Sequence, residues 1–161
     1  MSDDRDHKII HFPVKAKRAC HAVIGSAEIH QLRPRPSFLS LDLFTRGYIE
    51  SALWTEHESL TEDGGREAAY YENLSSAAIA RMEQDCLVFR TENEGDLSQY
   101  YDHSLGEDQA GHDFWLTRNG HGAGFWDRAI GEDLGERLSQ AASKMGTSDL
   151  YWSDDGFVEV G

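Results

Sequence analysis

The amino-acid sequence predicts an α+β fold, in which a small antiparallel sheet of two hairpins carries about three helices packed on one face. Apolar residues recur at helical spacing in three segments. Two dipeptides that favour tight turns, Asn119-Gly120 and Asp155-Gly156, each lie between runs rich in aromatic residues. The order helix, helix, hairpin, helix, hairpin is typical of an antiparallel sheet covered by helices.

Charge divides the 161 residues into two unequal parts. Residues 1–36 carry seven basic and four acidic side chains, whereas residues 37–161 carry eight basic and 25 acidic ones, a net charge of −17. We predict a basic N-terminal arm and linker over 1–36 and one acidic α+β domain over 37–161. Within the arm, residues 8–14 are a candidate edge strand, and the two prolines of residues 33–36 favour an extended linker.

The first helix is predicted over residues 44–56. Its core-facing stripe comprises Phe44, Tyr48, Ala52 and Thr55. Trp54 lies just off that stripe. A loop over residues 58–73 is expected to follow, with Asp63-Gly64-Gly65 as its turn.

The second helix is predicted over residues 76–92, with the Ser75 hydroxyl as its N-terminal cap. Four residues at helical spacing form its apolar face: Ile79, Met82, Cys86 and Phe89. This spacing makes Cys86 a core residue. A short helical piece near residues 97–101 is expected next.

The first hairpin is predicted over residues 112–127, with Asn119-Gly120 as a two-residue turn. In that register Phe114 faces Phe125, Trp115 faces Gly124, and His112 faces Asp127. We expect the large rings to pack over small partners, which leaves Trp115 and Phe125 buried at the structural centre.

The third helix is predicted over residues 133–145, with Gly146 as the left-handed residue that ends it. Its apolar face comprises Leu134, Leu138, Ala141 and Met145. The last hairpin pairs residues 150–152 with 157–160 around Asp155-Gly156.

Composition and the N-terminus indicate a cytoplasmic protein. No run of residues approaches the roughly 18–20 apolar positions of a membrane helix, and the acidic start of the chain lacks the apolar run of a secretory signal. The two cysteines, Cys20 and Cys86, fit no metal spacing and are expected to be reduced thiols. No cofactor is expected.

One segment carries a resemblance to a known family. The run Ala110-Gly-His-Asp-Phe-Trp-Leu-Thr-Arg-Asn-Gly-His-Gly-Ala-Gly-Phe-Trp-Asp-Arg128 resembles a family of small acidic proteins of unknown function that bacteriophages and mobile elements encode. The resemblance spans residues 38–161. Within that span, the other matching segments are 47–54, Asp85-Cys86, 149–151 and 154–156. It implies a bacterial host cell and an accessory role, but no catalytic residue.

A metal-assisted hydrolase is one alternative function. His112 and Asp127 would be neighbours at the open end of the predicted hairpin, with Asp113 adjacent, and imidazole and carboxylate are ordinary metal ligands. His121, at the other end, lies more than about 20 Å away and cannot share that ion. A simple His112–Asp127 pair that closes the hairpin is the favoured explanation of the pattern.

Other chemistry finds little support. The glycines of residues 120–124 lead into a predicted strand and not a helix, which excludes a dinucleotide loop. Ser51, Ser75 and Ser76 lack the motif of a nucleophile elbow.

The leading hypothesis is a non-enzymatic accessory protein that binds a host protein through an acidic surface. Acidic side chains attract basic surfaces and repel nucleic acid and anionic membranes. The narrower form is an inhibitor of restriction or CRISPR systems that imitates nucleic acid, since phage accessory proteins include such inhibitors. A virion-associated structural protein is a further alternative.

Two groups of candidate binding residues follow from this hypothesis. Arg118, Asn119 and His121 are expected to project from the tip of the first hairpin. Glu132, Asp133 and Glu136 cluster around the start of the third helix. The basic arm is expected either to touch nucleic acid or to fold back on the acidic domain.

Overall fold

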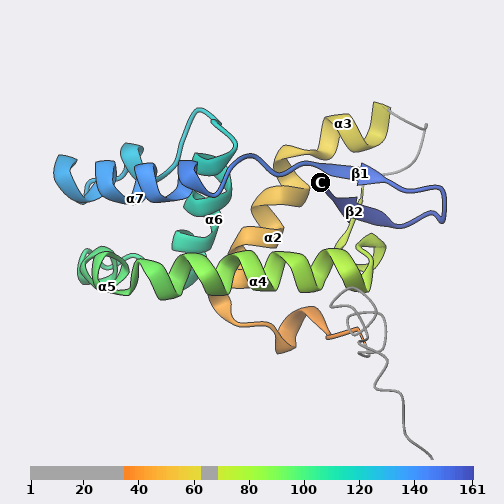
Figure 1. The fold of residues 1–161 in the computed structure, drawn as a ribbon, viewed down its shortest axis with the longest axis horizontal. Helices are drawn as coiled ribbons and strands as arrows, with labels where there is room; N and C mark the ends of the chain where they lie inside the picture. The colour runs from red at the N-terminus through yellow and green to blue at the C-terminus, as the bar shows by residue number, and fades with distance from the viewer. Residues whose placement is uncertain (1–34, 63–68) are drawn as a thin grey trace, which may run out of the picture.

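The computed structural model describes residues 35–62 and 69–161, which form a mostly helical α+β fold (Figure 1). Its α-helices are α2 (Leu43–Thr55), α3 (His57–Glu62), α4 (Ser76–Glu92), α5 (Glu94–Asp102), α6 (Glu107–Arg118) and α7 (Glu132–Lys144). Short 3₁₀ turns are η1 (Phe38–Ser40), η2 (Tyr71–Asn73) and η3 (Phe125–Asp127). In these ranges one antiparallel pair, β1 (Leu150–Trp152) and β2 (Val158–Val160), forms the sheet. The α+β class is confirmed, whereas the expected two hairpins and about three helices are wrong in number.

Several predictions fall outside the described residues. These are the candidate strand over residues 8–14, the first half (33–34) of the linker over 33–36, and the turn over 63–65. In the described ranges, no helix combines the length and the apolar character that crossing a bilayer requires.

Helices α2 and α4 lie where apolar periodicity predicts them. The Asp42 carboxylate accepts a hydrogen bond from the Thr45 backbone N–H at 3.0 Å and caps α2. The Ser75 hydroxyl accepts from the Ala78 backbone N–H at 2.9 Å and caps α4, as predicted. Cys86 is buried on the core face of α4.

Residues 107–118 form helix α6, so the predicted hairpin over 112–127 is wrong. Asn119 and Gly120 end this helix instead of turning a hairpin: Gly120 has φ +70°, the left-handed conformation common just after a helix. The expected cross-strand pairs are absent from the described fold. The chain nevertheless returns to α6, because the Phe125 backbone N–H donates to Thr117 Oγ1 at 3.0 Å.

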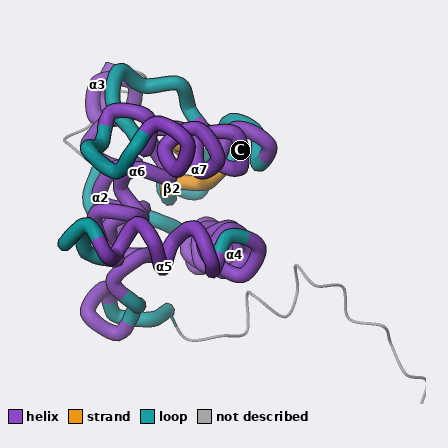
Figure 2. The backbone as a smooth tube through the Cα atoms, turned by 90° about the vertical axis from the view of Figure 1, so that its left-hand side faces the viewer, coloured by secondary structure: helices purple, strands orange, loops and turns teal. Residues whose placement is uncertain are grey.

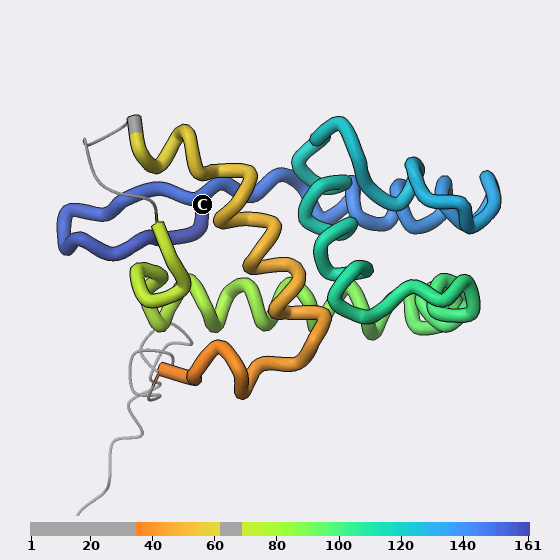
Figure 3. The backbone as a smooth tube through the Cα atoms, turned by 180° about the vertical axis from the view of Figure 1, so that it is seen from behind, coloured from red at the N-terminus to blue at the C-terminus, as the bar shows by residue number. Residues whose placement is uncertain are grey.

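Helices α2 and α6 lie in direct backbone contact (Figure 3). A Cβ atom built on Gly111 would lie 1.9 Å from the carbonyl oxygen of Phe44. One built on Gly47 would lie 1.9 Å from the carbonyl oxygen of Asp108. Both distances are far below van der Waals contact, so this helix crossing requires glycine at both positions.

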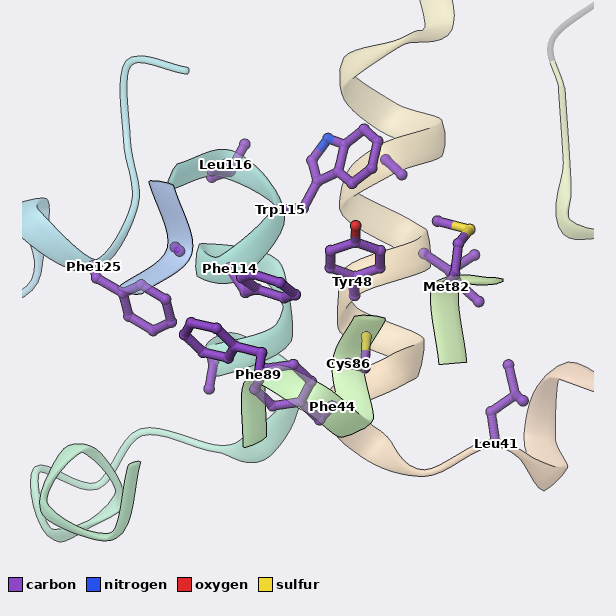
Figure 4. Close-up of a cluster of buried hydrophobic side chains, with 14 of the residues drawn as sticks. Leu41, Phe44, Tyr48, Met82, Cys86, Phe89, Phe114, Trp115, Leu116 and Phe125 are labelled. Atoms are coloured by element: carbon purple, nitrogen blue, oxygen red, sulfur yellow. The ribbon is translucent and has the colours of Figure 1, made fainter. Parts of the chain in front are cut away.

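Aromatic rings from four elements form the core around this crossing (Figure 4). Phe89 of α4 stacks on Phe114 of α6 with ring centroids 4.0 Å apart, and Tyr48 of α2 stacks on Phe114 at 5.1 Å. Phe125 of η3 approaches Phe89 at 5.8 Å. Such ring pairs add stabilisation beyond buried area alone. Trp115 and Phe125 are fully buried, as the sequence predicts, although neither lies in a strand.

The last helix and the last hairpin are confirmed. Strand β1 pairs with β2 in the register Leu150 to Val160 and Trp152 to Val158, and β2 also bridges Leu74. The hairpin and α3 lie at one end of the fold (Figure 1), whereas α5 and α7 lie together at the other end and face the viewer in Figure 2.

Candidate functional site

The residues of the metal hypothesis do not form the expected constellation. His112 and Asp113 are consecutive on α6, with His112 Nδ1 4.0 Å from Asp113 Oδ1, and Asp127 is exposed on η3. No three His, Cys, Asp or Glu side chains of the described ranges lie close enough together to hold a metal ion. The hairpin on which this hypothesis depended is the part of the prediction that is wrong.

Asp113 is instead a fully buried structural anchor. Arg128 donates from Nε to Oδ2 at 2.7 Å and from Nη2 to Oδ1 at 2.5 Å. The Tyr100 hydroxyl donates to Oδ2 at 2.8 Å, and the Gln109 amide donates to Oδ1 at 3.0 Å. Four donors occupy this carboxylate, so it fastens α5 and the segment after η3 to α6.

Arg118 is also buried, which corrects the prediction that it projects from an exposed tip. Its Nη1 donates to Asp85 Oδ2 at 2.8 Å and to the Tyr48 hydroxyl oxygen at 2.6 Å. Its Nε and Nη2 donate to the carbonyl oxygens of Gly146 and Met145. The guanidinium therefore ties α6 to α2, α4 and the end of α7.

Neither of the other two predicted tip residues is simply exposed. Asn119 is half-buried, and its side-chain oxygen accepts from the Ser148 backbone N–H at 2.8 Å. His121 is half-buried, and its Nε2 is a buried atom without a hydrogen-bond partner. Together with Trp54, His57 and Glu58 it lines a hollow of about 410 Å³.

The predicted acidic residues at the start of α7 are exposed. Glu132, Asp133 and Glu136 lie at the end of the fold where α7 meets α5 (Figure 2). A bidentate ion pair between Arg137 and Asp96 joins the two helices there. Glu132 and Asp133 also occupy the first turn of α7, where negative charge is favoured by the helix dipole.

The basic side chains of the domain are largely neutralised within the fold. The ion pairs to arginine are Arg81 and Arg118 with Asp85, Arg90 with Asp42, Arg128 with Asp113, and Arg137 with Asp96. In the described ranges the acidic partner in each of these pairs is an aspartate, and no glutamate forms an ion pair with an arginine. In those ranges the exposed glutamates therefore have no ion-pair partner, and unpaired acidic groups outnumber unpaired basic ones by more than the composition implies.

A groove of about 520 Å³ lies where η1, α2 and η2 meet, and the sequence analysis did not identify it. Four aromatic side chains line it, Phe38, Trp54, Tyr70 and Tyr71, together with the carboxylates of Glu50 and Glu72. Trp54 is 71% exposed and Tyr70 is 62% exposed, values unusual for such large rings. The position of Trp54 just off the core-facing stripe of α2 is the one sequence signal that points here.

The burial of three ionisable side chains makes the stability of the folded protein depend on pH. Burial raises the pKa of the Cys86 thiol well above its ordinary value near 9, and it raises the pKa of the Tyr48 and Tyr100 hydroxyls above their ordinary value near 10. The neutral forms therefore stabilise the folded state. That contribution is complete below pH about 9 and is lost as pH rises, because only the unfolded chain then releases these protons.

We expect the free energy of unfolding to fall above pH about 9, by up to about 1.4 kcal/mol per pH unit for each group. Urea unfolding between about pH 8 and pH 11 measures this loss. In a Cys86→Ala variant the fall should begin one pH unit later, near the ordinary pKa of tyrosine. Stability that stays constant up to pH about 11 would contradict the buried placement of these groups.

Comparison with protein-family models, curated proteins and solved structures found no match to this chain. The resemblance of residues 38–161 to a phage-encoded family therefore remains a prediction.

Proposed function

We propose that this chain is a non-enzymatic accessory protein that binds a basic surface of another protein through its own acidic surface. In this proposal it acts in the cytoplasm of a bacterial host cell and is encoded by a phage or mobile element. The partner's surface is one that normally holds nucleic acid, which makes the chain an inhibitor of a defence system such as restriction or CRISPR.

The observation that supports this proposal is that most arginines of the domain are held in ion pairs, whereas most carboxylates are not. Five arginines of the domain are held in ion pairs with aspartates inside or across the fold. In the described ranges, most of the carboxylates left over are exposed, and the domain carries a net charge of −17 over residues 37–161. Such a surface repels phosphate and attracts lysine- and arginine-rich surfaces, and the attraction accelerates encounter and selects the partner.

The α7 acids supply a defined place to test this proposal. Glu132, Asp133 and Glu136 are exposed on one helical turn beside α5, so their charges add on one side of the molecule. We expect a partner recovered from bacterial lysate to be basic and to be displaced by duplex DNA or RNA. Replacing all three acids with lysine should weaken its binding by at least tenfold, as calorimetry measures.

The matched control replaces Glu92, Asp149 and Asp154 with lysine. These residues are also exposed but lie apart, so the net charge changes equally without altering the α7 cluster. This control should weaken binding less than the α7 variant does. Melting temperatures must be compared, since losing Glu132 and Asp133 from the first helical turn costs about 0.3–1 kcal/mol each. Recovery of neutral or acidic partners alone would contradict the proposal.

A further inference from the structure

The groove between η1, α2 and η2 has the chemistry of a site for a cationic side chain. Its walls carry the rings of Phe38, Trp54, Tyr70 and Tyr71, and its exposed charged groups include Glu50 and Glu72. Among the described residues that line it there is no lysine or arginine. Aromatic faces attract cations through their quadrupole, and carboxylates at the same site add a direct charge interaction.

The chain itself shows how this region holds a guanidinium. The Arg35 guanidinium carbon lies 5.1 Å from the centroid of the Tyr71 ring. Arg35 also donates hydrogen bonds to the backbone carbonyl oxygens of Tyr71 and Glu72. Arg35 contacts the Tyr71 ring but does not line the groove. Trp54, Tyr70 and the two glutamates therefore stay accessible.

We infer that this groove binds an arginine side chain of a basic protein segment, with the guanidinium against the Trp54 and Tyr70 rings and close to Glu50 and Glu72. This inference rests on the proposed function and names the contact that anchors the partner. Arginine suits the site better than lysine, because its flat guanidinium stacks on rings while donating to carboxylates.

In this inference one partner contacts both the groove and the α7 acids. Helix α4 begins beside η2 and ends beside α5, and its 17 residues span about 25 Å. A protein interface of ordinary size, about 800 Å² on each side, covers a comparable width. The α7 acids then govern mainly the rate of association, and the groove governs mainly the rate of dissociation.

A short peptide of alternating glycine and arginine is the probe for the groove, because it is too short to span both places. Calorimetry with the full chain should show binding that is at least fivefold tighter than for the same peptide with lysine. Trp54→Ala should weaken binding roughly 5- to 30-fold, the equivalent of about 1–2 kcal/mol. A Glu50→Gln/Glu72→Gln variant should weaken it by a similar factor.

Trp126→Ala is the matched control, since Trp126 is also a largely exposed tryptophan but lies on η3, away from the groove. It should bind the peptide like the parent, and the α7 lysine variant should weaken peptide binding less than Trp54→Ala does. Peptide binding unchanged by Trp54→Ala would overturn the inference while leaving the proposed function standing. A parent that binds neither this peptide nor any basic protein would overturn both.

Two other occupants of the groove are distinguishable in the same experiments. Peptide binding that appears only after Lys15, Lys17 and Arg18 are replaced by glutamate would assign the groove to the chain's own basic arm. A dimer in sedimentation that Trp54→Ala dissociates would assign it to a second copy of the chain. Either result would overturn the inference.

Discussion

Replacing Arg118 with methionine is expected to lower the free energy of unfolding by about 3–5 kcal/mol. The substitution leaves the Asp85 carboxylate without its buried partner and leaves the carbonyl oxygens of Met145 and Gly146 without a donor. Removing one partner of a buried ion pair is among the most destabilising changes that a single substitution makes, and the partner that Asp85 keeps, Arg81, is largely exposed. Urea unfolding of the full chain measures the difference.

Two further variants distinguish the loss of the buried Arg118–Asp85 ion pair from a general loss of packing. Arg118→Met combined with Asp85→Leu removes both charges and should recover part of the lost stability. Arg137→Met removes an arginine that pairs with Asp96 at the surface, and its melting temperature should stay close to that of the parent. An Arg118→Met protein as stable as the parent would show that the buried network is not a structural anchor.

Replacing Gly111 with alanine should destabilise the fold by about 3 kcal/mol or more. The new Cβ would lie 1.9 Å from the Phe44 carbonyl oxygen and 2.9 Å from the Tyr48 backbone nitrogen. Backbone atoms of a helix cannot yield locally, so α2 and α6 must separate and the ring stacking between Tyr48 and Phe114 must loosen. Thermal unfolding followed by circular dichroism measures the effect.

Gly95→Ala makes the same substitution where space allows it. Gly95 lies in helix α5, and a Cβ built on it meets no atom within 4 Å. Alanine restricts the unfolded chain more than glycine does, so this variant should be stabilised by about 0.4–1 kcal/mol. Equal melting temperatures for the Gly111→Ala and Gly95→Ala proteins would contradict the close crossing of α2 and α6.

Local sequence signals predict the elements that have one buried side. Helices α2, α4 and α7 each show an apolar stripe at helical spacing, and the last hairpin has its Asp-Gly turn between alternating residues. Ser75 and Gly146 mark helix ends correctly, because capping and left-handed conformations depend on neighbouring residues alone.

Helix α6 escapes prediction because it is buried from Ala110 to Arg118 on nearly every side, His112 being half-buried. A helix without a polar face shows no periodicity, and its aromatic residues then resemble a strand. The Asn119-Gly120 pair compounds the error. The same dipeptide that turns a hairpin also ends a helix, since both uses require a residue with positive φ.

The candidate site likewise contains residues that local sequence patterns place correctly and residues whose placement depends on distant contacts. The α7 acids are correctly placed at the surface because they lie opposite an apolar stripe in a helix that periodicity identifies. The burial of Arg118 depends on Asp85, 33 residues away, and no local pattern reveals that pairing. The groove around Trp54 joins η1, α2 and η2, so it exists only in the assembled fold.

The association rate of the full chain with its recovered partner, measured at rising salt concentration, tests the central claim most directly. Charge attraction between an acidic and a basic surface is screened by salt, over about 8 Å at physiological ionic strength. Association should therefore slow steeply between about 50 and 500 mM salt while dissociation changes little. Association that is indifferent to salt would show that the exposed carboxylates of this protein do not select its partner.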